Sequence, residues 1–256
     1  MDDQPIDQPD QQAAPTATAV ERVLQLLENG QMDVEGLMPD SSNYTFLVRI
    51  ADDDLQGLAI YKPRRGERPL WDFPRGTLCQ REAAAYLVSS ALGWAIVPPT
   101  VLREGPEYGV GSVQLFINAD LEAHYFTLRG TNDEAFKRIA AFDIVVNNAD
   151  RKGGHILKDE QGRLWGIDHG ITFHVEPKLR TVIWEYAGQP IPAPLVEEIG
   201  RLGQQLEQAD DPLPVALGAL LSRVEVDALR RRIERVVRRP RYPEPTGGRS
   251  MPWPPI

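Results

Sequence analysis

Cysteine is almost absent from this chain, which has only Cys79 among its 256 residues. A single cysteine excludes an intramolecular disulfide and a zinc site built from cysteines. We expect Cys79 to be a small packed hydrophobic side chain rather than a nucleophile. The sequence also lacks an apolar run long enough to span a membrane, and its acidic start has no signal peptide. These absences predict a cytoplasmic protein.

Positive charge is in short supply as well, since 28 Lys and Arg face 37 Asp and Glu, for a net charge of -9. This balance argues against general nucleic-acid binding. The exception is the segment 223–249, which holds nine Arg against four acids. Either the segment attracts an anionic membrane or polyphosphate, or the arginines cover the solvated face of a terminal helix. The apolar positions favour the helix, because they repeat at helical spacing: Val226, Leu229, Ile233, Val236 and Val237.

Two aspartates carry the chemistry that the sequence suggests. Asp150 lies in a polar loop after a hydrophobic helix, and Asp168 lies between an apolar run and Gly170. Phosphoryl transfer depends mainly on positioning the triphosphate and neutralising its charge with metal ions. In that chemistry Asp150 would accept the proton of the attacking hydroxyl, and Asp168 would hold Mg²⁺. The pattern predicts a nucleotide-binding phosphotransferase, whereas two unrelated loop acids are the simpler alternative.

The residues after Asp150 follow a protein-kinase loop only in part. Such a loop has Lys two residues after its Asp and Asn five residues after it, and here these places hold Lys152 and His155. Lys152 can steady the transferred phosphate. A hard cation such as Mg²⁺ prefers oxygen ligands, whereas neutral imidazole can bind Mn²⁺ or donate a hydrogen bond to a phosphate. Metal binding by His155, a purely structural histidine and a weak or absent kinase activity all stay open.

Nucleotide contacts are expected from the first half of the chain. Lys62 ends the β-branched run 58–62 and would contact the phosphates, and Glu82 in the helical stretch 81–92 would hold it by an ion pair. A solvated strand-end lysine and an ordinary first-turn acid are the alternatives. The apolar stretch 111–117 predicts a strand that leads into a lobe connector. Its residues at the adenine edge would be Gln114, Leu115, Phe116 and Ile117.

Glycines are missing from the turn that would cover the phosphates, residues 39–44. Without them the backbone cannot approach phosphate oxygens as closely as in a glycine-rich loop. The hydroxyl groups of Ser41 and Ser42 are the expected donors in this turn instead.

The ordered set of motifs resembles the phosphatidylinositol 3-/4-kinase superfamily, with type II phosphatidylinositol 4-kinases and HipA-like kinases as the nearest relatives. The motifs are Tyr61-Lys62-Pro63, Glu82 in an Ala-rich helix, Asn148-Ala149-Asp150-Arg151 and Ile167-Asp168-His169-Gly170. Within this superfamily the chain looks like the actinobacterial SCO1664 family along residues 20 to 240. The resemblance implies ATP between two lobes, with Mg²⁺ or Mn²⁺. It does not imply a lipid acceptor, because the superfamily also contains protein kinases.

The predicted fold is α+β, a bilobal protein-kinase-like fold with a small β-rich N-lobe and a mostly helical C-lobe. We expect a disordered tail over 1–17, the N-lobe over 18–118, the C-lobe over 119–239 and a Pro-rich tail over 240–256 that is either disordered or an extended strap. Thr18 would cap a helix through Glu28, and Asn132 would cap a longer one. Strands are expected near 44–50, 56–62, 112–117 and 164–167, and further helices near 193–208, 212–221 and 224–238.

The expected activity is transfer of the γ-phosphoryl group of ATP to a hydroxyl of a protein or small molecule. A phosphatidylinositol kinase is the first alternative, but no loop with exposed aromatic side chains for membrane insertion is apparent. A nucleotide-binding pseudokinase is the second, because of His155 and the missing glycines. The segment 63–77 is expected to be a loop over the cleft mouth, where an anionic acceptor or plain solvent would surround its arginines: Arg64, Arg65, Arg68 and Arg75.

Overall fold

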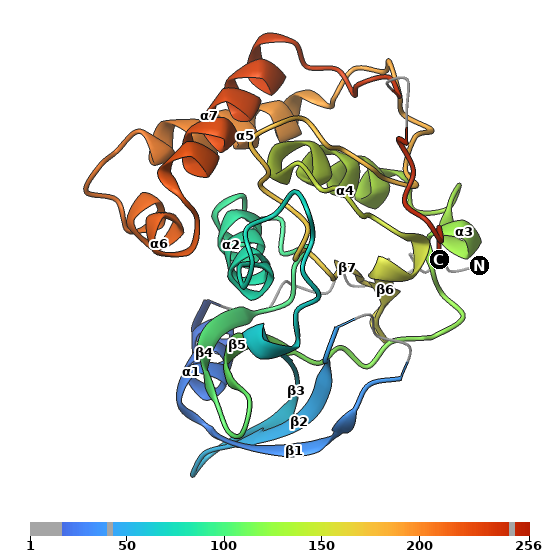
Figure 1. Ribbon diagram of the computed structural model, residues 1–256. Helices are drawn as coiled ribbons and strands as arrows, with labels where there is room; N and C mark the ends of the chain where they lie inside the picture. The colour runs from blue at the N-terminus through green and yellow to red at the C-terminus, as the bar shows by residue number, and fades with distance from the viewer. Residues whose placement is uncertain (1–16, 40–42, 246–248) are drawn as a thin grey trace, which may run out of the picture.

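The computed structural model describes residues 17–39, 43–245 and 249–256 (Figure 1). The predicted phosphate donors Ser41 and Ser42 lie outside the described residues, as does nearly all of the predicted N-terminal tail. Within the described ranges the chain forms a five-stranded sheet, a two-stranded sheet and seven α-helices. This is the predicted α+β composition.

The large sheet is antiparallel, with strand order β1-β2-β3-β5-β4. Its strands are β1 (Gln31–Leu37), β2 (Phe46–Ala51), β3 (Gln56–Pro63), β4 (Thr100–Gly105) and β5 (Gly109–Leu115). Helix α1 (Ala17–Asn29) packs on one face and contributes Leu26 and Leu27 to a core with Met32, Val48 and Tyr61. The helix includes Thr18 within its first turn, so the prediction that Thr18 caps it is wrong.

Alternation along β3 decides which side chains face the cleft. Ala59 and Tyr61 are fully buried under α1, so Ile60 and Lys62 face the opposite side of the sheet. Lys62 pairs with Ser112 of β5. Gly111, the residue before Ser112 in β5, lies very close to β3. A Cβ at Gly111 would lie 2.5 Å from the Lys62 carbonyl oxygen. A glycine is therefore required where the two strands meet beside Lys62.

The second part of the molecule is mostly helical (Figure 1). Its helices are α2 (Leu78–Ala91), α3 (Tyr125–Leu128), α4 (Asp133–Val146), α5 (Ala193–Leu206), α6 (Pro212–Leu220) and α7 (Arg223–Arg238). A short hairpin of β6 (Ile156–Lys158) and β7 (Leu164–Gly166) lies among them. Helix α4 begins as predicted after Asn132, but the Asn132 side chain makes no capping hydrogen bond, so that part of the prediction is wrong.

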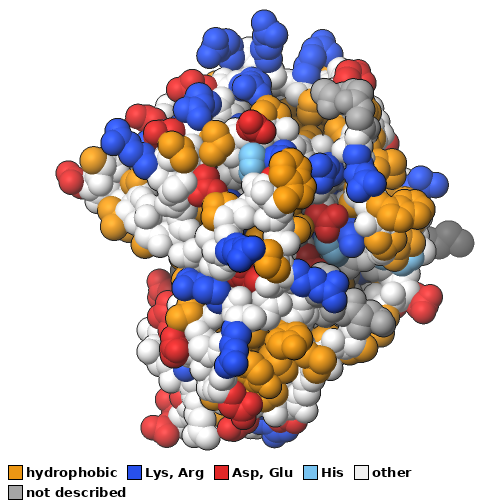
Figure 2. All heavy atoms as spheres, in the orientation of Figure 1, with side chains coloured by type: hydrophobic (Ala, Val, Ile, Leu, Met, Phe, Trp, Pro, Cys, Tyr) orange, Lys and Arg blue, Asp and Glu red, His pale blue; other side chains and the backbone are white. Residues whose placement is uncertain are grey.

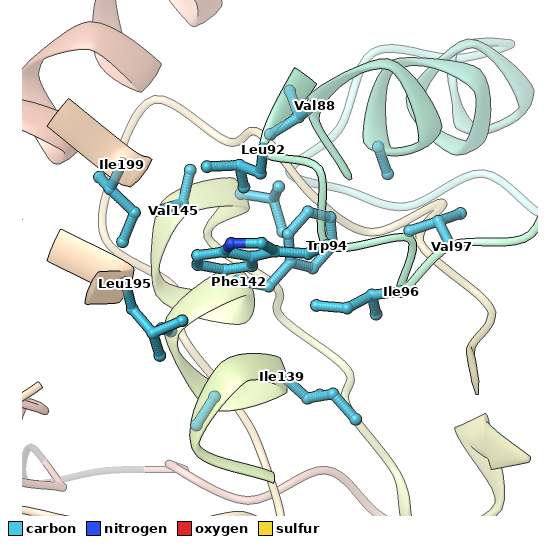
Figure 3. Packing of buried hydrophobic residues seen from close by; sticks show 14 of the residues in the cluster. Val88, Leu92, Trp94, Ile96, Val97, Ile139, Phe142, Val145, Leu195 and Ile199 are labelled. Carbon is cyan, nitrogen blue, oxygen red and sulfur yellow. The ribbon is translucent and has the colours of Figure 1, made fainter. Parts of the chain in front are cut away.

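Helix α2 packs with the helices of this second part. Val88 and Leu92 lie in one hydrophobic cluster with Phe142 of α4 and Ile199 of α5, and Trp94 fills the space between these helices (Figure 3). Figure 3 shows the indole of Trp94 among side chains of α4 and α5. Helix α2 carries Glu82 at the cleft. Because α2 shares this core with α4, Glu82 is fixed relative to the loop of Asp150, which follows α4.

The described C-terminal residues, 240–245 and 249–256, form an extended strap, one of the two predicted alternatives. The amide of Gly188 donates to the Tyr242 carbonyl, and that of Thr181 donates to the Ser250 carbonyl. Further along, the amide of Gly153 donates to the Pro255 carbonyl at 2.7 Å. The strap therefore ends against the turn that follows Asp150, and Figure 1 shows the C-terminus beside α3.

Candidate active site

A cleft of about 530 Å³ lies between the five-stranded sheet and the helical part. It is lined by every described residue that the sequence predicted for the site: Lys62, Glu82, Gln114, Leu115, Phe116, Ile117, Asp150, Lys152, His155 and Asp168. Figure 2 shows acidic and histidine side chains inside the hollow between the two parts, with lysine and arginine side chains along its borders. The structure thus brings together residues that are up to about 100 positions apart in the sequence.

Lys62 is held between two carboxylates. Its Nζ lies 2.7 Å from Glu82 Oε1 and also forms an ion pair with Asp168 Oδ1. Burial lowers the pKa of Lys62, but the charges of Asp168 and Glu82 outweigh burial and raise the pKa above its ordinary value. The ammonium group therefore stays charged at neutral pH, as contact with phosphate oxygens requires.

Glu82 links Lys62 of the sheet to the segment that carries Asp168. Its Oε1 accepts from Lys62, and its Oε2 accepts the backbone N–H of His169 at 2.9 Å. Glu82 is only 4% exposed, and both of its oxygens are used. The residue is thus more than a first-turn acid, because it fixes Lys62 relative to the segment that carries Asp168.

Asp168 follows β7 in the left-handed backbone region, with φ of 58°. Non-glycine residues seldom adopt this conformation, and strain of this kind clusters at functional sites. Its Oδ2 lies 3.3 Å from His155 Nε2. Burial raises the pKa of Asp168, but the charges of Lys62 and His155 outweigh it and hold that pKa well below its usual range. The carboxylate is therefore ionised at neutral pH.

Asp150 has the opposite electrostatic character. Its Oδ2 is 3.8 Å from Lys152 Nζ, which is too long for a direct hydrogen bond. Burial raises the pKa of Asp150 to about 6, and Lys152 offsets that increase only in part. A carboxylate with a pKa near the working pH suits a proton acceptor.

His155 is neutral at physiological pH. Burial lowers its pKa to about 4, although Asp168 acts in the opposite direction. A neutral imidazole is the form that binds metal ions. Within the described residues no group of three or more His, Cys, Asp or Glu side chains gathers around one point. A metal ion here would therefore have at most Asp168 and His155 as such ligands.

Behind the loop of Asp150 lies a buried ionic cluster that was not predicted from the sequence. The Arg151 guanidinium donates to both Asp143 oxygens from Nε, at 3.2 and 3.0 Å, and to Oδ1 from Nη2 at 2.9 Å. Its Nη1 donates to the carbonyls of His155 and Ile167. Arg151 therefore ties the loop of Asp150 to the segment of Asp168. An acid inside the apolar helix run of α4, at Asp143, was the signal for such a partner.

Asn148 is structural too. Its amide donates to Asp143 Oδ1 at 2.9 Å, and its carbonyl oxygen accepts the backbone N–H of Asp150 at the same distance. His169 is fully buried beside this cluster, with Nε2 2.6 Å from Arg151 Nη2. Burial and the nearby Arg151 hold the pKa of His169 well below its ordinary value, so the ring accepts a hydrogen bond from Arg151.

A second buried arginine fixes helix α2. Arg81 is 1% exposed and forms an ion pair with Glu225 of α7, and it donates to the Thr172 carbonyl at 2.7 Å. Glu225 also accepts from the amide and hydroxyl of Ser222 at the start of α7. Because Arg81 precedes Glu82 directly, this contact sets the position of the glutamate that orients Lys62.

The connector after β5 leaves the Ile117 amide without a partner among the described residues. The amides of Leu115 and Phe116 donate to the carbonyls of Pro99 and Leu58, and the Gln114 side chain donates to Thr100. Ile117 N–H donates no hydrogen bond within the described part of the chain. Of the four residues predicted at the adenine edge, Ile117 thus offers the backbone donor.

Comparison with known proteins adds to this geometry. No family model matches the chain. The protein Rv2133c of Mycobacterium tuberculosis is 38% identical over 265 residues, covering 90% of this chain and 94% of that protein. The chain belongs to the Rv2133c family. A plant relative, phosphatidylinositol 4-kinase gamma 4 of Arabidopsis thaliana, is 30% identical over 54% of this chain. The chain spans only 28% of the length of that plant protein.

Solved structures show the fold to which this family belongs. A Golgi casein kinase superposes with a TM-score of 0.57 at 14% identity, over 88% of this chain and 75% of that one. The Helicobacter pylori proinflammatory kinase CtkA gives a TM-score of 0.51 at 11% identity, over 84% and 94%. The fold is therefore kinase-like, as predicted. None of the helices in the described ranges is both long and apolar enough to cross a membrane.

Proposed function

We propose that this protein is an ATP-dependent kinase that transfers the γ-phosphoryl group to a hydroxyl of a protein or small molecule. One observation carries the proposal: Lys62, paired with Glu82 and Asp168, shares a cleft with Asp150. A charged lysine, an ionised aspartate and a carboxylate with a raised pKa are the groups that phosphoryl transfer needs. The kinase-like fold supports the proposal.

Each residue then has a role. Lys62 contacts the phosphates, Glu82 orients Lys62, and Asp150 accepts the proton of the attacking hydroxyl. Lys152, whose ammonium lies beside Asp150, stabilises the charge on the transferred group. The adenine lies along residues 114–117, with Ile117 as the backbone donor, and Ser41 and Ser42 cover the phosphates. These assignments belong to the proposal.

Asp168 and His155 would hold the divalent cation. Mg²⁺ is commonly bound by one or two protein ligands together with substrate phosphates, so a pair of side chains is sufficient. The donor set of one carboxylate and one neutral imidazole suits Mn²⁺ at least as well as Mg²⁺. When bound, the cation would neutralise charge on the phosphates. One structural neighbour, a Golgi casein kinase with Mn/ADP bound, is consistent with this choice.

Two finer assignments are part of the same proposal. Membership of the SCO1664 family, inside the phosphatidylinositol 3-/4-kinase-like superfamily, is supported by the similarity to plant phosphatidylinositol 4-kinases. A cytoplasmic location is supported by the composition described above.

A lipid acceptor is favoured by one specific observation. The sequence predicts no loop with exposed aromatic side chains, yet Trp71 in the arginine-containing segment 64–77 is 92% exposed. An exposed indole beside basic side chains is typical of surfaces that bind membrane interfaces. Phosphorylation of phosphatidylinositol in mixed vesicles, compared between wild type and Trp71→Ser, tests this alternative.

The main test separates nucleotide binding from catalysis. ATP with Mn²⁺ or Mg²⁺ at about 100 times its dissociation constant should stabilise the protein by roughly 2.7 kcal/mol. Asp168→Ala should abolish the metal-dependent part of that gain. Asp150→Asn should keep it while lowering ATP hydrolysis or transfer about 100-fold or more. Folded protein that no nucleotide and metal stabilise would refute the proposal, and binding without any turnover would favour a pseudokinase.

A further inference from the structure

A second, smaller hollow adjoins the cleft. Its volume is about 170 Å³, and three arginines line it: Arg64, Arg68 and Arg75. Glu67 and Leu78 line both hollows. Leu78 packs close to Gly170, two residues after Asp168. Glu67 and Leu78 thus form the boundary between the two hollows, and we call the smaller one the side chamber of the cleft.

The arginines of the segment 64–77 are available to a ligand. Arg64, Arg65, Arg68 and Arg75 are all exposed, and none forms an ion pair within the described ranges. Glu67 is the acid nearest to them in sequence, and its Oε1 is already occupied by the amide of Cys79 at 2.8 Å. Several unpaired guanidinium groups around one hollow attract an anion, and their planar donors match phosphate oxygens.

The segment is held in place at three points. Asp72 forms an ion pair with Lys178 at 2.9 Å, with both side chains largely buried. The ring of Phe73 lies between the Arg81 guanidinium, at 4.9 Å, and the His174 ring, at 5.1 Å. The amide of Arg68 donates to Asn43 Oδ1 at 2.8 Å. The loop that carries the arginines is thus fixed in position, so a ligand would bind to a preformed site.

Glu67 adds a second requirement on the ligand. Its Oε2 is buried and accepts no hydrogen bond from the described residues. A buried carboxylate oxygen without a donor is unfavourable, and a hydroxyl group on a bound molecule would satisfy it. The position of Glu67 at the junction of the two hollows places that hydroxyl between the arginines and the cleft.

We propose that the side chamber binds a phosphate group of the acceptor, and that the acceptor is a small soluble alcohol that already carries a phosphate. Arg68 and Arg75 hold the phosphate, Glu67 accepts a hydrogen bond from a neighbouring hydroxyl, and a second hydroxyl points toward Asp150. This inference rests on the proposed kinase function. It assigns the chemical class of the acceptor, a phosphorylated polyol.

The transfer step balances with these groups. The acceptor hydroxyl oxygen forms a bond to the γ-phosphorus, and the bond from that phosphorus to the β–γ bridging oxygen breaks. The hydroxyl proton goes to Asp150, and ADP leaves with the electron pair of the broken bond. The products are ADP and a bisphosphorylated alcohol.

The first experiment measures binding of inorganic phosphate by calorimetry to protein saturated with the ATP analogue AMP-PNP and Mn²⁺. The double variant Arg68→Gln/Arg75→Gln should bind phosphate at least about tenfold more weakly, because two charge-assisted contacts are lost. The matched control Arg235→Gln/Arg238→Gln removes the same charge from the exposed face of α7 and should bind phosphate like wild type. Equal phosphate affinity in all three proteins, or no saturable binding by wild type, would overturn the inference.

The second experiment compares alcohols with and without a phosphate: glycerol against glycerol 3-phosphate, and myo-inositol against its monophosphate. The phosphorylated member should have a kcat/KM at least about tenfold higher, and Arg68→Gln/Arg75→Gln should lower that advantage. A preference for the plain alcohols contradicts the inference. Phosphatidylinositol in vesicles is the third arm, and binding of these vesicles alone, with no response to soluble phosphates, would assign the arginines to a lipid surface instead.

The two proposals fail in different ways. If AMP-PNP and Mn²⁺ do not bind, the kinase proposal fails, whereas the phosphate titrations of nucleotide-free wild type and variants still show whether the chamber is an anion site. If AMP-PNP binds equally to all variants and phosphate does not distinguish them, only the acceptor assignment fails.

Discussion

The two sides of the loop that carries Asp150 contain the same kinds of charged residues. These residues are fully paired behind the loop and incompletely paired in front of it. Behind the loop, Asp143 and Arg151 have no exposed side-chain surface, and each is hydrogen-bonded several times. In front of it, the Asp150 side chain is 28% exposed and that of Lys152 21%, and their closest atoms are 3.8 Å apart. Charges that are fully paired maintain geometry, whereas charges left incompletely paired at a cleft are available for chemistry.

The difference also appears in stability. A buried ion pair contributes little net stability, yet removing one partner leaves an uncompensated charge. A carboxylate that is partly buried without a close partner lowers stability while it is ionised, as the raised pKa of Asp150 indicates. Opposite responses to mutation are therefore expected on the two sides of the loop.

The largest effect should come from Arg151→Met, which leaves Asp143 charged and buried. We expect a loss of about 3–5 kcal/mol in the free energy of unfolding, measured by urea denaturation. The double variant Asp143→Leu/Arg151→Met removes both charges and should recover a large part of that loss. If the double variant is as unstable as the single one, the hydrogen bonds of Arg151 to the backbone carbonyls matter more than the ion pair.

Arg81→Met should cost somewhat less, about 2–4 kcal/mol, because Ser222 still donates to Glu225 after the arginine is removed. It should also weaken ATP-analogue binding, since Arg81 sets the position of Glu82. The control is Arg231→Met on the exposed face of α7, which should change neither quantity. Unchanged analogue affinity in a destabilised Arg81→Met would limit this arginine to a folding role.

Asp150→Asn should have the opposite sign. At pH 7 the native carboxylate is ionised although its pKa is raised to about 6, so removing the charge should stabilise the protein by about 1–2 kcal/mol. The native state takes up protons between about pH 4 and 6, so the advantage of the variant should decline through that window and vanish near pH 4. Parallel stability curves for the two proteins would mean that the pKa of Asp150 is not raised.

The smallest effect is expected from deletion of residues 250–256 of the strap. Thr181, Trp184 and Gly153 would lose hydrogen bonds to it, but water can replace these partners, so the cost should be about 1 kcal/mol. Hydrogen exchange of the Gly153 amide should accelerate more than that of core amides. If protection of Gly153 is unchanged, the strap does not order the catalytic loop.

Sequence patterns predicted which residues in front of the loop lie together. A charged residue beside an apolar run stands out in a sequence, and four such residues were recognised in this way: Lys62, Glu82, Asp150 and Asp168. All four lie in one cleft. Period-2 alternation predicted β2 and β3, and helical periodicity predicted α4 and α7. Strand β1 was missed because its exposed face leaves the short run 31–37 with only Met32 fully buried, and strand β4 because it directly follows two prolines.

The buried ion pairs behind the loop could not be predicted from the sequence. Arg151 is paired with Asp143 across eight residues, and Arg81 with Glu225 across 144. The acid inside the apolar run of α4 signals a partner for Asp143 without saying which residue it is, and local spacing carries no information about a partner 144 residues away. The role of the tail depended on tertiary contacts too, since composition alone allows both disorder and a strap.

The strap has a consequence for how the protein is made. The Gly153 amide donates its hydrogen bond to the carbonyl of Pro255, about 100 residues further along the chain. At a synthesis rate of roughly 5–20 residues per second, the turn after Asp150 leaves the ribosome about 5 to 20 s before its partner does. Throughout that interval the nascent chain carries the loop of Asp150 without this contact. The turn after Asp150 therefore completes its hydrogen bonding only after residue 255 has been synthesised.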